Sequence, residues 1–380
     1  MNISEVETFV VANPPPRQGG RYFIFVKLKT DSGVAGIGEA YDATLDPHLV
    51  ARMIEAVAGR FLIGESPFNI ETFWRRAYGS GYALRPDPTL CGVISALEMA
   101  CWDLIGKECG RPVYDLLGCQ IHEGLRSYTY LYPPDGDDTY LPTTERHIYN
   151  DPSLAAEAAQ AALDKGFTAV KFHCWCLPEK DLELCRAALE QFPGTAFMHD
   201  VENNYSHEDA LRVGKELAEL NFTWFEAPFP DWDLDGYRQL TSQVDVPIIP
   251  SGNWLMDLQS FGHAVHSGTW TRARTDITCL GGLTPAWEAL QLCESAGIGC
   301  EVLGWGNTLI SAANLHLMLA NDCCSYFEQS VPYEPYEYGM LDVIRTDSDG
   351  QVTAPDSPGL GVRIDWDAME AATVHRLVFD

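Results

Sequence analysis

Basic residues are scarce in this chain of 380 residues: 25 Lys and Arg face 54 Asp and Glu, which gives a formal net charge of −29. A surface this acidic repels nucleic acid and anionic membranes, so we expect neither as a partner. An anionic substrate would need a local basic or metal-bearing pocket within this negative field.

Three further absences narrow the class of protein. No CxxC pair occurs among the 12 cysteines, which excludes zinc-ribbon and thioredoxin-type sites, and spacings such as Cys174 with Cys176 fit no small disulfide scaffold. No uncharged apolar run reaches the roughly 18 residues that a membrane span needs. The first residues form neither a basic nor an apolar leader segment. We therefore expect a soluble cytoplasmic protein with reduced cysteines.

The front of the chain is typical of a small α+β unit. An apolar content of 46% is enough for one large core and a smaller one. Strands are expected at 3–11, 22–30 and 34–40, and helices at 46–58, 69–76 and 90–107.

From about residue 127, apolar strands alternate with amphipathic helices every ~25–30 residues, which is the pattern of a parallel (β/α) barrel. Strands are expected at 127–132, 169–172, 196–199, 224–225, 247–249, 275–278, 299–303 and 326–327. The predicted fold class is α/β: a modified (β/α) TIM-type barrel with an α+β capping domain formed by the N-terminal region and the C-terminal tail. We place the capping domain at 1–125, completed by about 345–380, and the catalytic barrel at 126–344.

Polar side chains recur where these predicted strands end. They are Lys171, His173, Asp200, Glu226, Asn253 and Asp276. In a (β/α) barrel the chemistry lies at the C-terminal ends of the strands. A base followed by evenly spaced strand-end carboxylates is what the abstraction of a proton beside a carboxylate requires.

Four further stretches, at 95–107, 112–118, 276–284 and 358–361, resemble signatures of the enolase superfamily. Together with the strand ends, they make the chain similar to the mandelate racemase/muconate lactonizing enzyme group, which includes acid-sugar dehydratases. The resemblance implies a Mg²⁺ ion that binds the substrate carboxylate and stabilises an enediolate after a base removes the α-proton.

The resemblance implies a metal site that differs from the family pattern. Asp200 and Glu226 match the first two ligands, but Asn253 stands where the family has a third acid. Glu202 lies two residues after Asp200, a spacing that puts both side chains on one face at a strand end. Our hypothesis is a rebuilt site of Asp200, Glu202 and Glu226, with Asn253 as a neutral ligand or a hydrogen-bond partner.

The implied catalytic groups also differ. Lys171 matches a lysine that orients the substrate carboxylate, and His173 replaces the proton-abstracting lysine; histidine is a credible base because its ordinary pKa is about 6.5. Asp276 matches the Asp of an Asp–His dyad, but residues 301–307 contain no His. This absence disfavours a two-base racemase and favours a one-base reaction.

The other implied site residues contact the substrate. Glu328, at the end of the eighth strand, resembles a residue that hydrogen-bonds the substrate carboxylate. Capping-domain loops would supply Arg17, Arg21, Tyr82 and Arg85, because arginine can bind a carboxylate through two hydrogen bonds.

Three functions stay open at this point. The first is a Mg²⁺-dependent dehydratase of an aldonate or aldarate, the second is a sugar-lactone cycloisomerase, and the third is a non-catalytic family member with a binding or regulatory role. The expected partners are a small carboxylate substrate and further copies of the chain in a homo-oligomer.

Overall fold

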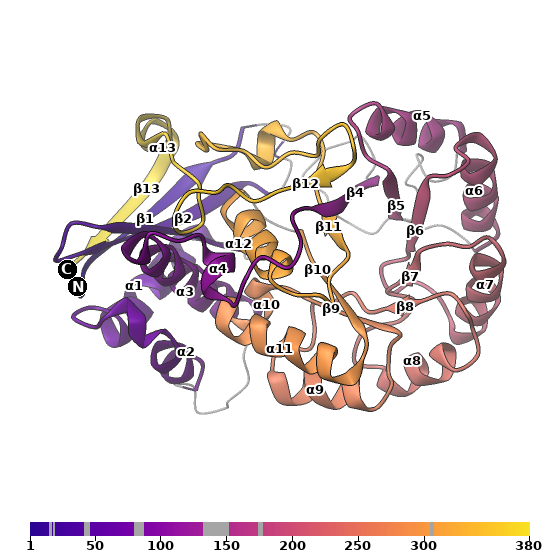
Figure 1. Cartoon of the computed structure of the whole chain (residues 1–380), viewed down its shortest axis with the longest axis horizontal. Coiled ribbons are helices and arrows are strands. Elements are labelled where there is room, and N and C mark those ends of the chain that lie inside the picture. Colours follow the sequence, from indigo (N-terminus) through magenta and orange to yellow (C-terminus); the bar gives the residue numbers. More distant parts are fainter. Residues whose placement is uncertain are drawn as a thin grey trace.

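A four-stranded antiparallel sheet with its helices packs against a (β/α) barrel in this computed structural model (Figure 1). The structure describes residues 1–14, 17, 20–41, 46–79, 87–131, 152–173, 178–304 and 308–380. The predicted combination of a barrel and an α+β unit is confirmed.

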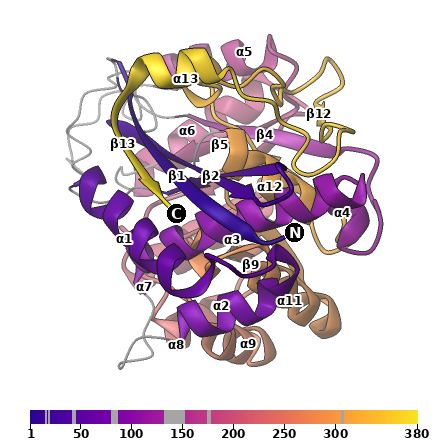
Figure 2. The same ribbon diagram turned by 90° about the vertical axis from the view of Figure 1, so that its left-hand side faces the viewer.

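The sheet of the α+β unit has the strand order β13-β1-β2-β3. Its strands are β1 (Ile3–Ala12), β2 (Tyr22–Thr30), β3 (Ala35–Ala40) and β13 (Thr373–Phe379). Because β13 pairs antiparallel with β1, the C-terminal strand completes the N-terminal sheet. Both chain ends lie on the outer side of this unit, and Figure 2 shows them apart from each other on that side (Figures 1 and 2).

The helices of this unit are α1 (Pro47–Phe61), η1 (Pro67–Asn69), α2 (Ile70–Tyr78) and α3 (Pro88–Cys109). The long helix α3 begins at its N-cap Asp87 and ends at Gly110, whose φ of 63° suits glycine. It packs directly on β3, where a Cβ at Gly36 or Gly38 would lie within 2.2 Å of α3 carbonyl oxygens. Among the described residues, α3 alone has the length and composition to cross a membrane, but 83% of its most apolar window is buried in the fold.

In the part of the chain that the structure describes, eight parallel strands form the barrel. They are β4 (Leu125–Leu131), β5 (Ala169–His173), β6 (Ala196–Asp200), β7 (Trp224–Glu226), β8 (Ile248–Ile249), β9 (Arg272–Thr275), β10 (Gly299–Val302) and β11 (Tyr326–Glu328). Hydrogen bonds join them in the order β11-β4-β5-β6-β7-β8, and β9 pairs with β10. Backbone hydrogen bonds from Thr271 N to Ile248 O (3.1 Å) and from Cys300 N to Cys323 O (2.9 Å) help to connect the two groups of strands.

The barrel helices cover the outside of the strands (Figure 1). They are α5 (Pro152–Leu163), α6 (Pro178–Gln191), α7 (His207–Glu219), α8 (Leu234–Thr241), α9 (Leu258–His266), α11 (Leu283–Ala296) and α12 (Thr308–Leu319). The shorter elements are α4 (Val113–Leu116), α10 (Ile277–Leu280), η3 (Glu334–Tyr336), β12 (Gln351–Val352) and α13 (Trp366–Ala372).

The strand expected at 275–278 is wrong. The strand β9 covers Arg272–Thr275, and the short helix α10 follows at once. The reason is a local cap: the Asp276 side chain accepts a hydrogen bond from Cys279 N and so starts the helix, which stops at Gly281 with a φ of 83°.

A buried acid joins the α+β unit to the barrel. Helix α11 begins after Gly282, which has no side chain to cap it. Glu98, fully buried on α3, takes over this role: its carboxylate accepts hydrogen bonds from Leu283 N (2.7 Å) and Thr284 N (3.0 Å). The first free N–H groups of the barrel helix are therefore satisfied by the other unit.

Candidate active site

Three strand ends meet at one level of the barrel. In the parallel register, His173 of β5 lies beside Asp200 of β6, and Asp200 lies beside Glu226 of β7. Lys171 lies two residues before His173 and points to the same side of the sheet. The sequence-predicted group of Lys171, His173, Asp200 and Glu226 is therefore brought together at the C-terminal mouth.

Lys171 is the centre of this group. Its Nζ lies 2.9 Å from Glu226 Oε1 and 3.2 Å from both Asp200 Oδ2 and Glu328 Oε1, and the residue is 1% exposed. Burial alone would lower its pKa, but the carboxylates of Glu226 and Glu328 outweigh this and hold the pKa of Lys171 well above its ordinary value. Lys171 is therefore a permanent cation inside a ring of acids.

Arg274 is a second buried cation, and the sequence reasoning missed it. Its Nη2 lies 2.6 Å from Glu328 Oε2, its Nε lies 3.4 Å from Glu226 Oε1, and its Nη1 donates to the Tyr128 hydroxyl at 3.1 Å. The residue is 1% exposed. In the strand β9, Arg274 lies between small residues, and its side chain points into the barrel. Its place in the strand was the signal from which the sequence could have identified it.

Glu328 is held as a carboxylate by both cations. It also accepts a hydrogen bond from Gly304 N at 2.9 Å. Although burial raises its pKa, Lys171 and Arg274 outweigh this and lower the pKa of Glu328 to about 2. One oxygen contacts Lys171 and the other Arg274, so Glu328 fixes the two cations relative to each other.

His173 lies at the edge of the acids. Its Nε2 is 3.2 Å from both Asp200 Oδ2 and Glu202 Oε1. Burial, together with the charge of Lys171, lowers the pKa of His173 well below its ordinary value. The imidazole is therefore neutral at pH 7, and a neutral imidazole is the form that can accept a proton.

Two family models match most of this chain. The mandelate racemase/muconate lactonizing enzyme N-terminal domain matches residues 6–118, and the enolase C-terminal domain-like model matches residues 153–368. The chain belongs to the mandelate racemase/muconate lactonizing enzyme group of the enolase superfamily.

Individual relatives cover nearly the whole chain. A crystal structure of a putative member of the group from Labrenzia alexandrii is 34% identical, with a TM-score of 0.88, and the match covers 98% of this chain and all of that one. The D-galactarolactone cycloisomerase of Agrobacterium fabrum is 26% identical, and the match covers 92% of this chain and 90% of the relative. The D-galactonate dehydratase of Ralstonia nicotianae is also 26% identical, and the match covers 99% of this chain and 94% of the relative.

Members of the enolase superfamily typically bind Mg²⁺, and the residues of this member fit such an ion. Donor atoms of His173, Asp200 and Glu202 all lie within 4.8 Å of one another. The cluster holds four carboxyl groups and two permanent cations, so one divalent ion would balance its charge once all four carboxyls are ionised. Oxygen ligands of this kind are those that Mg²⁺ prefers.

Two of these acids lose their protons less readily than an ordinary carboxyl group. Burial, reinforced by Asp200, raises the pKa of Glu202 to about 8. Burial also raises the pKa of Glu226 to about 7, although Arg274 opposes this. Glu202 is held toward the site by a left-handed backbone, with a φ of 47°, and by the bond from its N–H to Asp200 Oδ1 at 3.0 Å.

Asn253 and Asp276 are used differently from the family pattern. Asn253 is exposed, and its Oδ1 accepts a weak bond from Cys279 Sγ at 3.9 Å. Asp276 is buried, and its Oδ1 accepts bonds from Thr278 Oγ1 (2.7 Å) and Cys279 N (2.8 Å), which makes it the cap of α10.

The four predicted capping-loop residues divide into two pairs. Arg17 and Arg21 are exposed on the loop between β1 and β2. Tyr82 and Arg85 lie outside the described residues.

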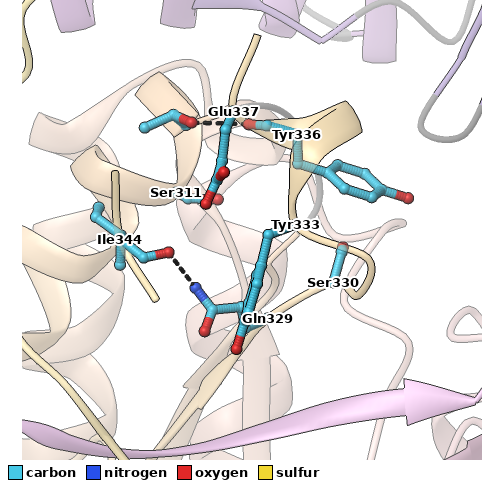
Figure 3. Close-up of a pocket in the computed structure, with 8 residues that line it drawn as sticks. Ser311, Gln329, Ser330, Tyr333, Tyr336, Glu337 and Ile344 are labelled. Atoms are coloured by element: carbon cyan, nitrogen blue, oxygen red, sulfur yellow. Dashed lines mark hydrogen bonds between the residues drawn. The ribbon is translucent and has the colours of Figure 1, made fainter. Parts of the chain in front are cut away.

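A polar pocket lies beside the site, between α12 and the segment that follows β11 (Figure 3). Its lining residues are Thr308, Ser311, Gln329, Ser330, Tyr333, Tyr336, Glu337 and Ile344. Ser330 hydrogen-bonds the Tyr130 hydroxyl, and the Tyr130 ring meets the His173 ring edge-on with 6.1 Å between centroids. The side chain of Tyr130 therefore lies between His173 and the hydroxyl groups that line this pocket.

Proposed function

We propose that the protein dehydrates a sugar acid, an aldonate or an aldarate, by a one-base reaction in which His173 removes the proton α to the carboxylate. The observation that carries this proposal is the position of His173, whose Nε2 lies 3.2 Å from Asp200 Oδ2 and from Glu202 Oε1 at the edge of a cluster of buried cations and carboxyl groups. The relatives named as a D-galactonate dehydratase and a D-galactarolactone cycloisomerase support this substrate class.

His173 has both proton roles in the proposed reaction. The imidazole takes the α-proton, the electron pair of the broken C–H bond forms a carbon–carbon double bond, and the β-hydroxyl leaves. His173 returns its proton to that hydroxyl, so that water departs and the imidazole is neutral again. The enol product then becomes a 2-keto-3-deoxy acid.

The cations and acids bind and orient the substrate. Lys171 would hold the substrate carboxylate next to His173, and Glu328 and Arg274 keep the ammonium in place. Asp200, Glu202 and Glu226 would hold a Mg²⁺ ion, which would neutralise the second negative charge that develops on the substrate carboxylate.

Proton exchange in D₂O tests the proposal most directly. A panel of mono- and diacid sugars is incubated with Mg²⁺ and followed by NMR, and keto products are detected with semicarbazide. The expected result is a 2-keto-3-deoxy product from at least one acid. His173→Asn should reduce turnover by about 10²–10⁴-fold, the size of a general-base contribution.

The matched control is His266→Asn, because His266 is exposed on the barrel helix α9. This variant should keep wild-type turnover. Full activity of His173→Asn, with a product formed by the wild type, would exclude His173 as the base.

A sugar-lactone cycloisomerase is the second candidate. It is favoured by the likeness to the D-galactarolactone cycloisomerase of Agrobacterium fabrum and is compatible with one base. It would yield deuterium at the α-carbon but no semicarbazide-reactive product, so the same assay separates the two.

A further inference from the structure

Two tryptophans stand exposed together on neighbouring loops of the barrel. Trp232 is 61% exposed and Trp254 is 54% exposed, and their rings meet edge to face with 4.6 Å between centroids. Trp232 follows β7 and Trp254 follows β8, so both belong to the C-terminal mouth where the acids lie. Exposing two such side chains side by side is costly in water and marks a binding surface.

A buried acid holds the two loops together. Asp231 is 1% exposed and accepts hydrogen bonds from Ser251 N (2.8 Å), Ser251 Oγ (2.8 Å) and Gly252 N (2.9 Å). Asp231 directly precedes Trp232, and Gly252 lies two residues before Trp254. The clamp therefore holds the backbones that carry both tryptophans next to each other, which reduces the entropy lost on binding.

The same loops contact the active-site cluster and the α+β unit. A Cβ at Gly252 would come within 2.9 Å of Arg274 Cγ, so the loop backbone lies directly on this buried cation. On the other side, the Tyr78 hydroxyl of α2 donates to Met256 O at 2.7 Å. The tryptophans thus lie on the rim between the charged cluster and the capping helices.

We infer that Trp232 and Trp254 form the subsite that binds the carbon chain of the sugar acid, with its C–H groups against the indole faces. This inference rests on the proposed function for its ligand class. Aromatic faces carry no net charge and add apolar area that can pack against the C–H groups of a sugar acid. The hydroxyls of the ligand can remain in water or reach polar loop atoms.

The size of the patch argues against a second copy of the chain as the occupant. Each indole buries at most ~150–250 Å². The pair therefore supplies well under the roughly 800 Å² per partner of a stable interface. A small ligand needs far less area, so the patch suits a sugar acid better than a protein.

Titration calorimetry with sodium D-galactonate and disodium D-galactarate tests the inference on the full chain with Mg²⁺. Trp232→Ala and Trp254→Ala should each weaken binding by about tenfold, or 1.4 kcal/mol, and the ligand should quench tryptophan fluorescence in the wild type. Both side chains are exposed, so melting temperatures should stay near that of the wild type. Leu341→Ala is the matched control, since Leu341 is 55% exposed outside the barrel loops.

Each outcome decides one question. Wild-type affinity and KM in the double variant overturn the inference and leave the proposed function intact. Binding that depends on the tryptophans, without turnover or α-deuteration, overturns the proposed function and supports the inference. A lower mass of the variant Trp232→Ala/Trp254→Ala in light scattering, or binding of neither sugar acid to the wild type, also overturns the inference.

Discussion

Arg274→Met should destabilise the protein strongly. The guanidinium contacts Glu328 at 2.6 Å, Glu226 at 3.4 Å and Tyr128 at 3.1 Å, all in a buried setting. Removing one partner of a buried ion pair costs about 3–5 kcal/mol because a charge is left uncompensated. We expect a loss in this range, since Glu328 keeps Lys171 and Gly304 N while Glu226 loses its second cation.

Urea unfolding, followed by fluorescence and circular dichroism together, measures this loss. Arg238→Met is the matched control: Arg238 pairs with Asp235 on the surface of α8, so its loss should cost no more than about 0.5 kcal/mol. In the double variant Arg274→Met/Glu328→Gln, both members of the contact are changed, and the cost should be at least about 1 kcal/mol less than the sum of the single variants. A cost for Arg274→Met as small as that of Arg238→Met would refute the electrostatic account of this cluster.

The remaining predictions concern the metal and the junction of the two units. Chelation of divalent ions should abolish turnover and lower the melting temperature, and millimolar Mg²⁺ should restore both; an unchanged melting curve would argue against the site. Glu202→Gln should weaken Mg²⁺ binding at least ~10-fold in calorimetry. Asn253→Ala should change Mg²⁺ binding little because Asn253 is exposed. A larger loss of affinity in Asn253→Ala than in Glu202→Gln would identify Asn253 as the ligand. Glu98→Ala should cost about 2 kcal/mol or more in urea unfolding, since it leaves buried N–H groups of α11 without acceptors, and a change under ~0.5 kcal/mol would contradict this role. Burial raises the pKa of Glu98 to about 7, so the folded state binds a proton that the unfolded state releases. The free energy of unfolding of the wild type should therefore fall relative to that of Glu98→Gln as the pH rises from about 4.5 through 7. A difference between the two proteins that does not change with pH would refute this pKa shift.

The strand-end residues could be predicted because a barrel converts sequence position into spatial position. Each parallel strand ends at the same mouth, so acids placed after successive apolar runs must become neighbours. His173, Asp200 and Glu226 indeed lie side by side in register, and Lys171 joins them two residues earlier. No long-range contact has to be known for this inference.

Arg274 could not be predicted in the same way. The strand was expected at 275–278 instead of 272–275, so Arg274 fell outside it. Its burial is favourable only because barrel closure brings Glu226 and Glu328 within ion-pair distance from β7 and β11. The same holds for Glu98, whose hydrogen-bond partners follow it by 185 and 186 residues.

The sequence by itself determined the family, the barrel with its α+β unit and the identity of the strand-end groups, because periodicity and local motifs specify which residues end each strand. Only the tertiary structure decided how those groups share charge: Lys171 and Arg274 are fixed by Glu328, Asp276 caps a helix, Asn253 stays exposed, and Glu202 turns toward His173. The physical reason is that charge balance in a buried cluster depends on distances between distant segments, and these distances exist only once the barrel has closed.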